Sequence, residues 1–166
     1  MTRLTSRVLF LLAALSCAGL IGFALFLQHI EGLEPCPLCI SQRIVVIAIG
    51  LAALVATIHN PGHLGYKIYG VLTSLLGASG MALASRQIWI QHLPPEQVPS
   101  CMPGVEYLVD ILPLTEFVKI MLTGTGDCAE IQWTFLGLTI PGWTLLTFAG
   151  FTVFGIYEIF RKRRRV

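Results

Sequence analysis

The sequence predicts an all-α membrane protein: a bundle of four transmembrane helices, with a long outer loop that carries a short amphipathic surface helix. Three observations support this prediction. Apolar residues make up 55% of the 166 residues and charged residues only 12%, which is about half the charged share of a typical soluble domain. Four apolar stretches are about long enough to cross a bilayer core. The charged residues gather mainly between these stretches and at the chain ends.

The first apolar stretch, residues 8–27, contains no charged residue. Arg3 and Arg7 precede it, as basic residues precede the apolar core of a signal peptide. Such a core is only about 7–15 residues long and ends at small residues. Here the apolar run continues well past Cys17, so we expect an uncleaved transmembrane helix.

The other three spans are expected at about residues 40–58, 68–90 and 143–160. The second carries Arg43 near its start, the third carries Arg86 near its end, and the fourth carries Glu158 close to its exit. Glycines are frequent in all four spans, which suits close packing of helices in lipid. The whole chain, residues 1–166, is expected to form a single membrane domain.

The distribution of charge predicts the orientation of the bundle. Most of the eleven Lys and Arg residues lie in the two tails or in the short loop before the third span. These are Arg3, Arg7, Lys67, Arg161, Lys162, Arg163, Arg164 and Arg165. All but one of the nine acidic residues lie in the other two loops, 28–39 and 91–142. The positive-inside rule then puts both termini in the cytoplasm and the two acidic loops outside.

The long outer loop has its own pattern. Residues 105–122 interleave apolar and charged side chains, with an interruption at Pro113. This pattern is typical of an amphipathic helix that lies on the membrane surface. An ordinary packed loop helix is the alternative.

Four of the five cysteines lie on the outward side. Cys36 and Cys39 form a Cys-Pro-Leu-Cys motif at the start of the second span, and Cys101 and Cys128 lie in the long outer loop. Cys17 lies in the middle of the first span, where a thiol behaves as a small apolar residue. Thiols outside the cytoplasm tend to be oxidised, so two disulfides are expected, and four cysteines allow three pairings.

Three interpretations of these cysteines compete. Structural disulfides would explain Cys101 and Cys128, but a bond between Cys36 and Cys39 would remove little loop entropy. A zinc site usually has two tight ligand pairs, and here the second pair is far apart with no histidine at a matching spacing, so no metal is expected. Redox chemistry fits best, because Cys-x-x-Cys is a dithiol suited to oxidation and reduction.

The residues around Cys39 also favour redox chemistry. Pro37 can occupy the first turn of a helix without losing a hydrogen bond, which would leave Cys39 near the helix N-terminus, where an anion is stabilised. Arg43 follows one turn later on the same face, and a cation there would favour the Cys39 thiolate. An arginine so close to the hydrocarbon marks a functional site, and a snorkelling anchor is the compatible alternative.

Two motifs carry a resemblance to a known family. The segments Glu34-Pro-Cys-Pro-Leu-Cys-Ile-Ser-Gln-Arg43 and Gly126-Asp-Cys-Ala-Glu-Ile-Gln-Trp-Thr-Phe-Leu-Gly-Leu138, with four spans and a basic tail, resemble the DsbB family of bacterial disulfide bond formation proteins. The resemblance covers the whole chain. The family oxidises DsbA, a soluble periplasmic thioredoxin-fold oxidase, and sends the electrons to ubiquinone or menaquinone.

The resemblance implies a quinone-dependent thiol oxidase in the bacterial inner membrane, with its redox cysteines in the periplasm. The implied partners are a DsbA-type protein, the membrane quinone pool and the lipid bilayer, with no nucleic acid. Because DsbA is a strong oxidant, its reoxidation requires an acceptor that is more oxidising than ordinary thiols. A quinone supplies such an acceptor.

The resemblance also implies a role for each cysteine. Cys101–Cys128 would be the disulfide that the reduced partner attacks, at Cys101. Cys128 would leave as a thiolate and attack Cys36 of the Cys36–Cys39 disulfide, through a transient Cys36–Cys128 bridge. Cys39 would then donate to the quinone, with Arg43 stabilising the thiolate and the reduced ring. Each transfer between sulfurs is thiol–disulfide exchange.

One position departs from the family pattern. Many members have a histidine, thought to contact the quinone, just after the arginine that ends the third span. Here Gln87 follows Arg86 and is expected to occupy that place. A glutamine can donate a hydrogen bond to a quinone carbonyl, but it cannot supply a proton.

Two rival functions stay open at this point. A vitamin K epoxide reductase-like protein is also a four-helix redox membrane protein, but there the Cys-x-x-Cys lies on a late span, after the loop pair. A membrane scaffold with two inert disulfides is the rival without catalysis. In a scaffold, Cys36→Ser would be harmless.

Overall fold

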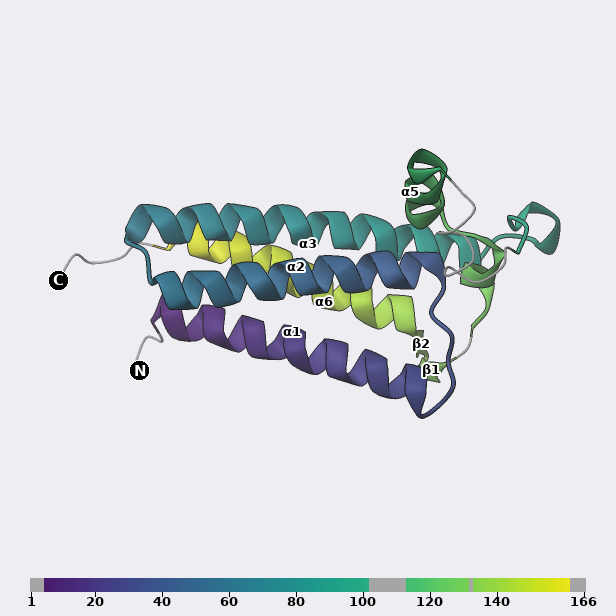
Figure 1. Cartoon of the computed structure of the whole chain (residues 1–166), viewed down its shortest axis with the longest axis horizontal. Coiled ribbons are helices and arrows are strands. Elements are labelled where there is room, and N and C mark those ends of the chain that lie inside the picture. Colours follow the sequence, from purple (N-terminus) through teal and green to yellow (C-terminus); the bar gives the residue numbers. More distant parts are fainter. Residues whose placement is uncertain (1–4, 102–112, 132, 162–166) are drawn as a thin grey trace.

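The computed structural model of the protein describes residues 5–101, 113–131 and 133–161. Four long helices dominate these ranges (Figure 1): α1 (Ser6–His29), α2 (Pro37–His59), α3 (His63–Gln91) and α6 (Ile140–Phe160). Each of them is long and apolar enough to cross a membrane. The prediction of an all-α membrane protein with four spans is confirmed.

Each long helix contains the stretch expected from hydropathy and extends beyond it at one end or both. Residues at the helix starts explain part of this difference. α2 begins at Pro37, with Cys36 as its N-cap, and α6 carries Pro141 in its first turn. Proline is well tolerated there, because the first N–H groups of a helix have no partner within the helix. Proline itself has low hydropathy, so a span predicted from hydropathy begins after these residues.

The short elements lie together at one end of the bundle, and the start of α1 and the end of α6 lie at the opposite end (Figure 1). The short elements are η1 (Pro95–Gln97), α5 (Leu114–Thr123), η2 (Gly126–Ala129), β1 (Thr134–Phe135) and β2 (Leu138–Thr139). β1 and β2 pair in an antiparallel hairpin. Its turn holds Leu136 and Gly137 at positive φ, the backbone conformation that a tight hairpin turn requires.

The bundle packs in sequence order along α1, α2, α3 and α6, and the α3–α6 contact is the most extensive. Glycines allow α3 and α6 to approach closely. A Cβ added at Gly77 of α3 would lie 3.0 Å from the backbone nitrogen of Thr152 and 3.1 Å from the carbonyl oxygen of Phe148. This backbone-to-backbone contact is the kind that small residues provide in membrane helices.

The second half of the predicted surface helix is present as α5, which starts directly after Pro113. Residues 105–112 of that prediction lie outside the described residues. α5 lies across the direction of the long helices (Figure 1), with Leu114, Val118 and Leu122 exposed on one side. Its C-terminal turn is held to α2 by a hydrogen bond of 2.7 Å from Ser41 Oγ to the carbonyl oxygen of Met121.

Candidate redox site

The start of α2 brings Cys36 and Cys39 together. Cys36 is the N-cap and Cys39 lies in the first helical turn, so the two side chains are on the same side of the helix end. Their sulfur atoms lie 3.1 Å apart, and all five cysteines are free thiols in this structure. The short spacing therefore forms a dithiol at the helix N-terminus, as the Cys-x-x-Cys motif predicts.

Cys128 joins this pair from the distant loop. η2 places it against the start of α2, where it is 1% exposed and packs with Cys36, Leu38 and Ile90. Its sulfur shares a hydrogen bond with the Cys36 thiol. Cys128, which is far from the Cys36–Cys39 motif in the sequence, thus joins it in one buried cluster.

The hydrogen bonds around Cys128 favour its thiolate. The one from the Cys36 thiol has the largest effect, and the backbone of Leu38 and both groups of Thr125 add to it. Together they outweigh burial and lower the pKa of Cys128 to about 6. The same contact with Cys128, together with Cys39 and burial, raises the pKa of Cys36. In the reduced cluster these contacts therefore favour a protonated Cys36 and a Cys128 thiolate.

Cys101 lies on the exposed side of η2. Its sulfur is 3.0 Å from the point where a Cβ on Gly126 would be, and the Gly126 N–H donates to the carbonyl oxygen of Ser100. The carboxylate of Asp127, through a hydrogen bond and its charge, raises the pKa of Cys101. Cys101 and Cys128 therefore flank the same short turn, with one thiol reachable and the other buried.

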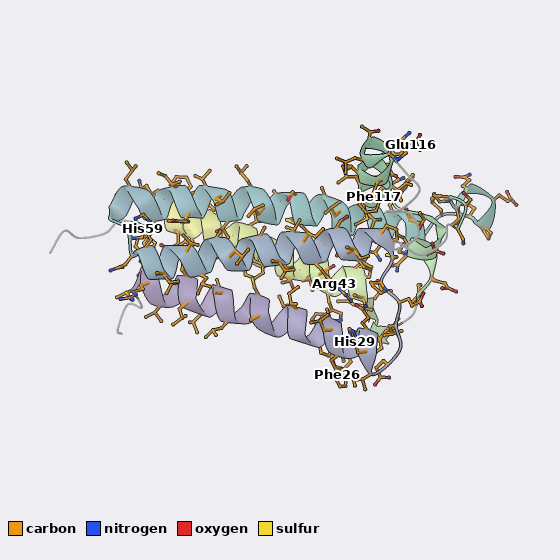
Figure 2. The ribbon with its side chains drawn as sticks, in the orientation of Figure 1. Phe26, His29, Arg43, His59, Glu116 and Phe117 are labelled. Atoms are coloured by element: carbon orange, nitrogen blue, oxygen red, sulfur yellow. The ribbon has the colours of Figure 1, made fainter. Side chains whose placement is uncertain are left out.

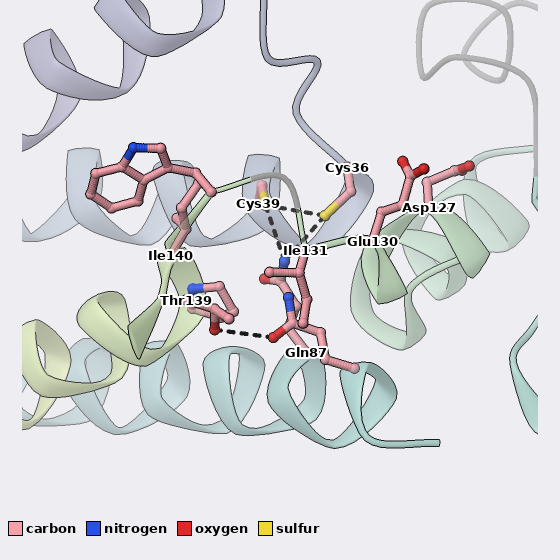
Figure 3. Close-up of a pocket in the computed structure, with 11 residues that line it drawn as sticks. Cys36, Cys39, Gln87, Asp127, Glu130, Ile131, Thr139 and Ile140 are labelled. Carbon is pink, nitrogen blue, oxygen red and sulfur yellow. Dashed lines mark hydrogen bonds between the residues drawn. The ribbon is translucent and has the colours of Figure 1, made fainter. Parts of the chain in front are cut away.

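Gln87 of α3 points its amide at the dithiol (Figure 3). Gln87 Nε2 donates to Cys39 Sγ at 3.3 Å and to Cys36 Sγ at 3.5 Å. Its Oε1 accepts a hydrogen bond of 2.7 Å from Gln42 Nε2. The residue that was expected beside a quinone thus contacts both sulfurs of the motif directly.

Arg43 contacts α1. Its guanidinium donates to Oε1 of Gln28 and, at 3.2 Å, to the carbonyl oxygen of Ala24, and Figure 2 shows Arg43 on the side of α2 that faces α1. Within the described ranges, the side-chain hydrogen bonds of Cys39 are to Cys36 and Gln87. Helical spacing predicted that Arg43 and Cys39 lie on the same face of α2. The long side chain of Arg43 instead reaches oxygen acceptors on the C-terminal half of α1.

A small pocket opens beside Cys36 and Cys39 (Figure 3). Apolar side chains, amides and carboxylates share its lining. Besides the two cysteines, the lining residues are Gln87, Gln91, Asp127, Glu130, Ile131, Trp133, Thr139, Ile140 and Pro141. Such a mixture of apolar surface and a few polar groups is typical of sites for small organic molecules.

Three residues of the site were not identified from the sequence. Gln42 and Thr144 form hydrogen bonds behind Gln87, and Asp127 contacts Cys101. The sequence holds one signal for Gln42, because Ser41, Gln42 and Arg43 are consecutive polar residues at the start of an apolar span. Thr144 carries no such signal, since a threonine in a helix commonly bonds to its own backbone.

Comparison with known proteins gives consistent matches. The family model described as "Disulfide bond formation protein DsbB" matches residues 6–157. The chain is 50% identical over 161 residues to "Disulfide bond formation protein B" of Hahella chejuensis, a match that covers 97% of this chain and 98% of that protein. It is 46% identical over 164 residues to the protein of the same description from Methylococcus capsulatus, covering 99% of this chain and all of that protein.

Proposed function

Because the chain belongs to the DsbB family of disulfide bond formation proteins, we propose that it reoxidises a periplasmic DsbA-type dithiol oxidase and passes the electrons to ubiquinone or menaquinone. An oxidoreductase role in disulfide formation goes with the family. The observation that carries the finer proposal is the series of cysteines from the exposed Cys101, past the buried Cys128, to Cys36 and Cys39 at a membrane helix.

The environments of Cys101 and Cys128 support the first exchange. In a Cys101–Cys128 disulfide, the sulfur with the lower thiol pKa leaves more readily. A thiolate of the reduced partner would therefore attack the exposed Cys101 Sγ, break the bond and release Cys128 as a thiolate. The second thiol of the partner, as a thiolate, would then attack its own sulfur in the mixed disulfide. The partner leaves oxidised, and Cys101 is left reduced.

The contact between Cys128 and Cys36 supports the second exchange. The Cys128 thiolate would attack Cys36 Sγ, break the Cys36–Cys39 bond and release Cys39 as a thiolate. Attack by Cys101 on Cys128 would then restore the Cys101–Cys128 disulfide and leave Cys36 and Cys39 reduced. Each step exchanges one sulfur–sulfur bond for another, so two electrons have moved from the partner to the dithiol at α2.

The chemical character of the small pocket beside Cys39 supports a quinone as the acceptor. Ile131, Trp133 and Ile140 supply apolar surface, and Gln91 supplies an amide of the kind that bonds to a ring carbonyl. A bound quinone would take up the two electrons of the dithiol together with two protons. Gln87 donates a hydrogen bond to Cys39. Arg43 places a positive charge one helical turn after Cys39, and this charge favours negative charge at the start of α2.

A groove between α1 and α6 suits a lipid-soluble acceptor. Leu9, Leu12, Leu20 and Phe23 of α1 line it, together with apolar residues of α6. Phe23 also packs edge-on against Trp133 of the pocket, with ring centroids 6.4 Å apart. An apolar tail in the groove would therefore lie next to the pocket at Cys39.

The proposed location is the bacterial inner membrane, with several spans, both termini in the cytoplasm and the redox cysteines in the periplasm. The distribution of basic and acidic residues supports this orientation. So does the grouping of the cysteine-bearing loop segments at the end of the bundle away from the start of α1 and the end of α6 (Figure 1). Only this orientation exposes Cys101 to a soluble periplasmic partner.

Quinone reduction by the purified protein tests the proposal. The protein is mixed with a reduced DsbA-type partner and a ubiquinone or a menaquinone analogue, and the ultraviolet absorbance of the quinone is followed. We expect turnover by the wild type, none by Cys39→Ser, and a raised quinone KM in Arg43→Ala. Cys17→Ala is the matched control, since Cys17 is a buried thiol of α1 that packs against α2 and α6, and it should turn over normally.

If the wild type reduces neither quinone while its own cysteines stay oxidised, the proposal is wrong, and the inert scaffold or another acceptor takes its place. Full turnover by Cys39→Ser would exclude Cys39 as the donor.

A further inference from the structure

A chain of hydrogen bonds runs from α6 through α2 and α3 to the dithiol. Thr144 Oγ1 of α6 donates to Gln42 Oε1 at 2.6 Å. Gln42 Nε2 of α2 donates to Gln87 Oε1 of α3 at 2.7 Å. Gln87 Nε2 then donates to Cys39 Sγ at 3.3 Å. Thr144 is therefore connected to a sulfur atom that it does not touch.

The two amides of this chain are withdrawn from solvent. Gln42 and Gln87 are each 4% exposed, and a buried amide is costly unless it is hydrogen-bonded. Throughout the part of the chain that the structure describes, every buried side-chain nitrogen and oxygen atom has a partner. Loss of one member would leave the next with an unpaired polar atom, so the members hold one another in orientation.

The chain of hydrogen bonds has a direction, because each amide has one oxygen that accepts and one nitrogen that donates. The Thr144 hydroxyl occupies the oxygen of Gln42, which leaves the Gln42 nitrogen to face Gln87. Gln87 in turn presents its nitrogen to the sulfurs. The Thr144 hydroxyl also lies 3.0 Å from the carbonyl oxygen of Pro141, but its contact with Gln42 is the shorter one.

The direction of these hydrogen bonds decides whether Cys39 Sγ faces an N–H group or an amide oxygen. An N–H group stabilises a thiolate, whereas an amide oxygen at the same place would repel it. Without the donor at Thr144, the Gln42 amide could turn over, and Gln87 would then turn its own oxygen towards Cys39.

We propose that Gln42 and Thr144 are positioning residues that keep the N–H groups of Gln87 directed at Cys39 and so favour its thiolate. Neither residue touches a sulfur, so neither is a catalytic residue. The use of this thiolate as an electron donor rests on the proposed function. The effect of Thr144 on Cys39 rests on the hydrogen-bond chain alone and can be measured without a partner protein or a quinone.

The test is the rate at which iodoacetamide alkylates Cys39 in the fully reduced, full-length protein in detergent, across a range of pH. Mass spectrometry of the peptides gives the rates of Cys39 and Cys101 in the same molecule, and Cys101 serves as the internal reference. In Thr144→Val the ratio of the two rates at neutral pH should fall about tenfold, the size of one lost hydrogen bond to a charged group. The pH profile of Cys39 should move to higher pH.

Three further variants sharpen the test. Thr144→Ser keeps the hydroxyl and should restore the wild-type ratio. Thr147→Val removes a hydroxyl that, among the described residues, bonds only to the backbone of its own helix, at Trp143, and it should leave the ratio unchanged. Gln42→Met removes the donor to Gln87 and should lower the ratio at least as far as Thr144→Val.

An unchanged pH profile of Cys39 in both Thr144→Val and Gln42→Met would overturn the proposal, and so would a failure of Thr144→Ser to restore it. A purely structural role would lower the stability of both variants without moving the profile. Because alkylation needs neither quinone nor partner, this result is independent of the turnover assay. If the wild type shows no turnover while Thr144→Val still shifts the pH profile of Cys39 alkylation, only the proposed function is contradicted.

Discussion

At the residue scale, two cysteines of one loop have opposite environments. Cys128 is buried against the N-terminus of α2 and accepts several hydrogen bonds, which lower its pKa to about 6. Cys101 is exposed next to Asp127, whose negative charge raises its pKa. A disulfide between them would be asymmetric, with an accessible sulfur to attack and a stable anion to leave.

The titration of Cys128 gives the first prediction at this scale. Because its pKa is lowered, the thiolate forms as the pH rises through about 6 and is lost below that value. The thiolate absorbance of the fully reduced protein in the far ultraviolet should therefore show a step in this acidic range. Cys128→Ser should lose the step and Cys101→Ser should retain it. An identical titration in Cys128→Ser and wild type would contradict this assignment.

At the element scale, α3 and α6 form the most extensive contact of the bundle, and glycines define its closest points. A Cβ on Gly155 of α6 would lie 2.5 Å from the carbonyl oxygen of Gly70, and one on Gly70 would lie 2.9 Å from that of Gly155. Backbone atoms cannot move aside as a flexible side chain can. The spacing of α3 and α6 thus depends on the absence of side chains, and it determines where Gln87 and Thr144 lie.

The prediction at this scale compares two glycines. Gly77→Val forces a side chain into the backbone of α6 and should lower the free energy of unfolding by about 1–3 kcal/mol, the usual cost of overpacking. Gly150→Val is the matched control, since a Cβ at Gly150 meets no atom within 4 Å. Thermal unfolding in detergent measures both. Equal melting temperatures for the two variants would show that the α3–α6 contact tolerates a wider separation.

At the scale of the whole molecule, the loop segments that carry the cysteines gather at one end of the bundle, and the start of α1 and the end of α6 lie at the other (Figure 1). In the proposed pathway, electrons that enter at Cys101 would have to cross only the short elements to reach the start of α2. The molecule therefore needs no large rearrangement to bring its cysteine pairs together, because η2 already lies against α2.

Labelling of intact spheroplasts tests the orientation. A membrane-impermeant maleimide should modify Cys101 in a variant that keeps only this cysteine, in the reduced state. His63→Cys, made in a cysteine-free chain, places a thiol at the exposed start of α3, and it should react only after the membrane is permeabilised. The reverse pattern of labelling would mean that the bundle is inverted in the membrane.

Much of the architecture could be predicted from the sequence because it depends on local properties. Hydropathy predicted four spans, and the amphipathic pattern of residues 105–122, interrupted at Pro113, included the segment that forms α5. The spacing of Cys36 and Cys39 alone places two sulfurs at one helix end, since residues three apart in a helix lie on the same face. The family resemblance rested on such local motifs and is confirmed by the matches over nearly the whole chain.

The sequence by itself therefore determined the four apolar helices and the position of Cys36 and Cys39 at one helix end. Only the tertiary structure decided the rest: that Arg43 reaches α1, that Cys128 accepts hydrogen bonds at the start of α2, and that Gln42 and Thr144 fix the amide of Gln87. These contacts join residues of different helices and loops. They depend on how each helix is rotated and how closely its neighbours approach, and no pattern within one segment encodes either quantity.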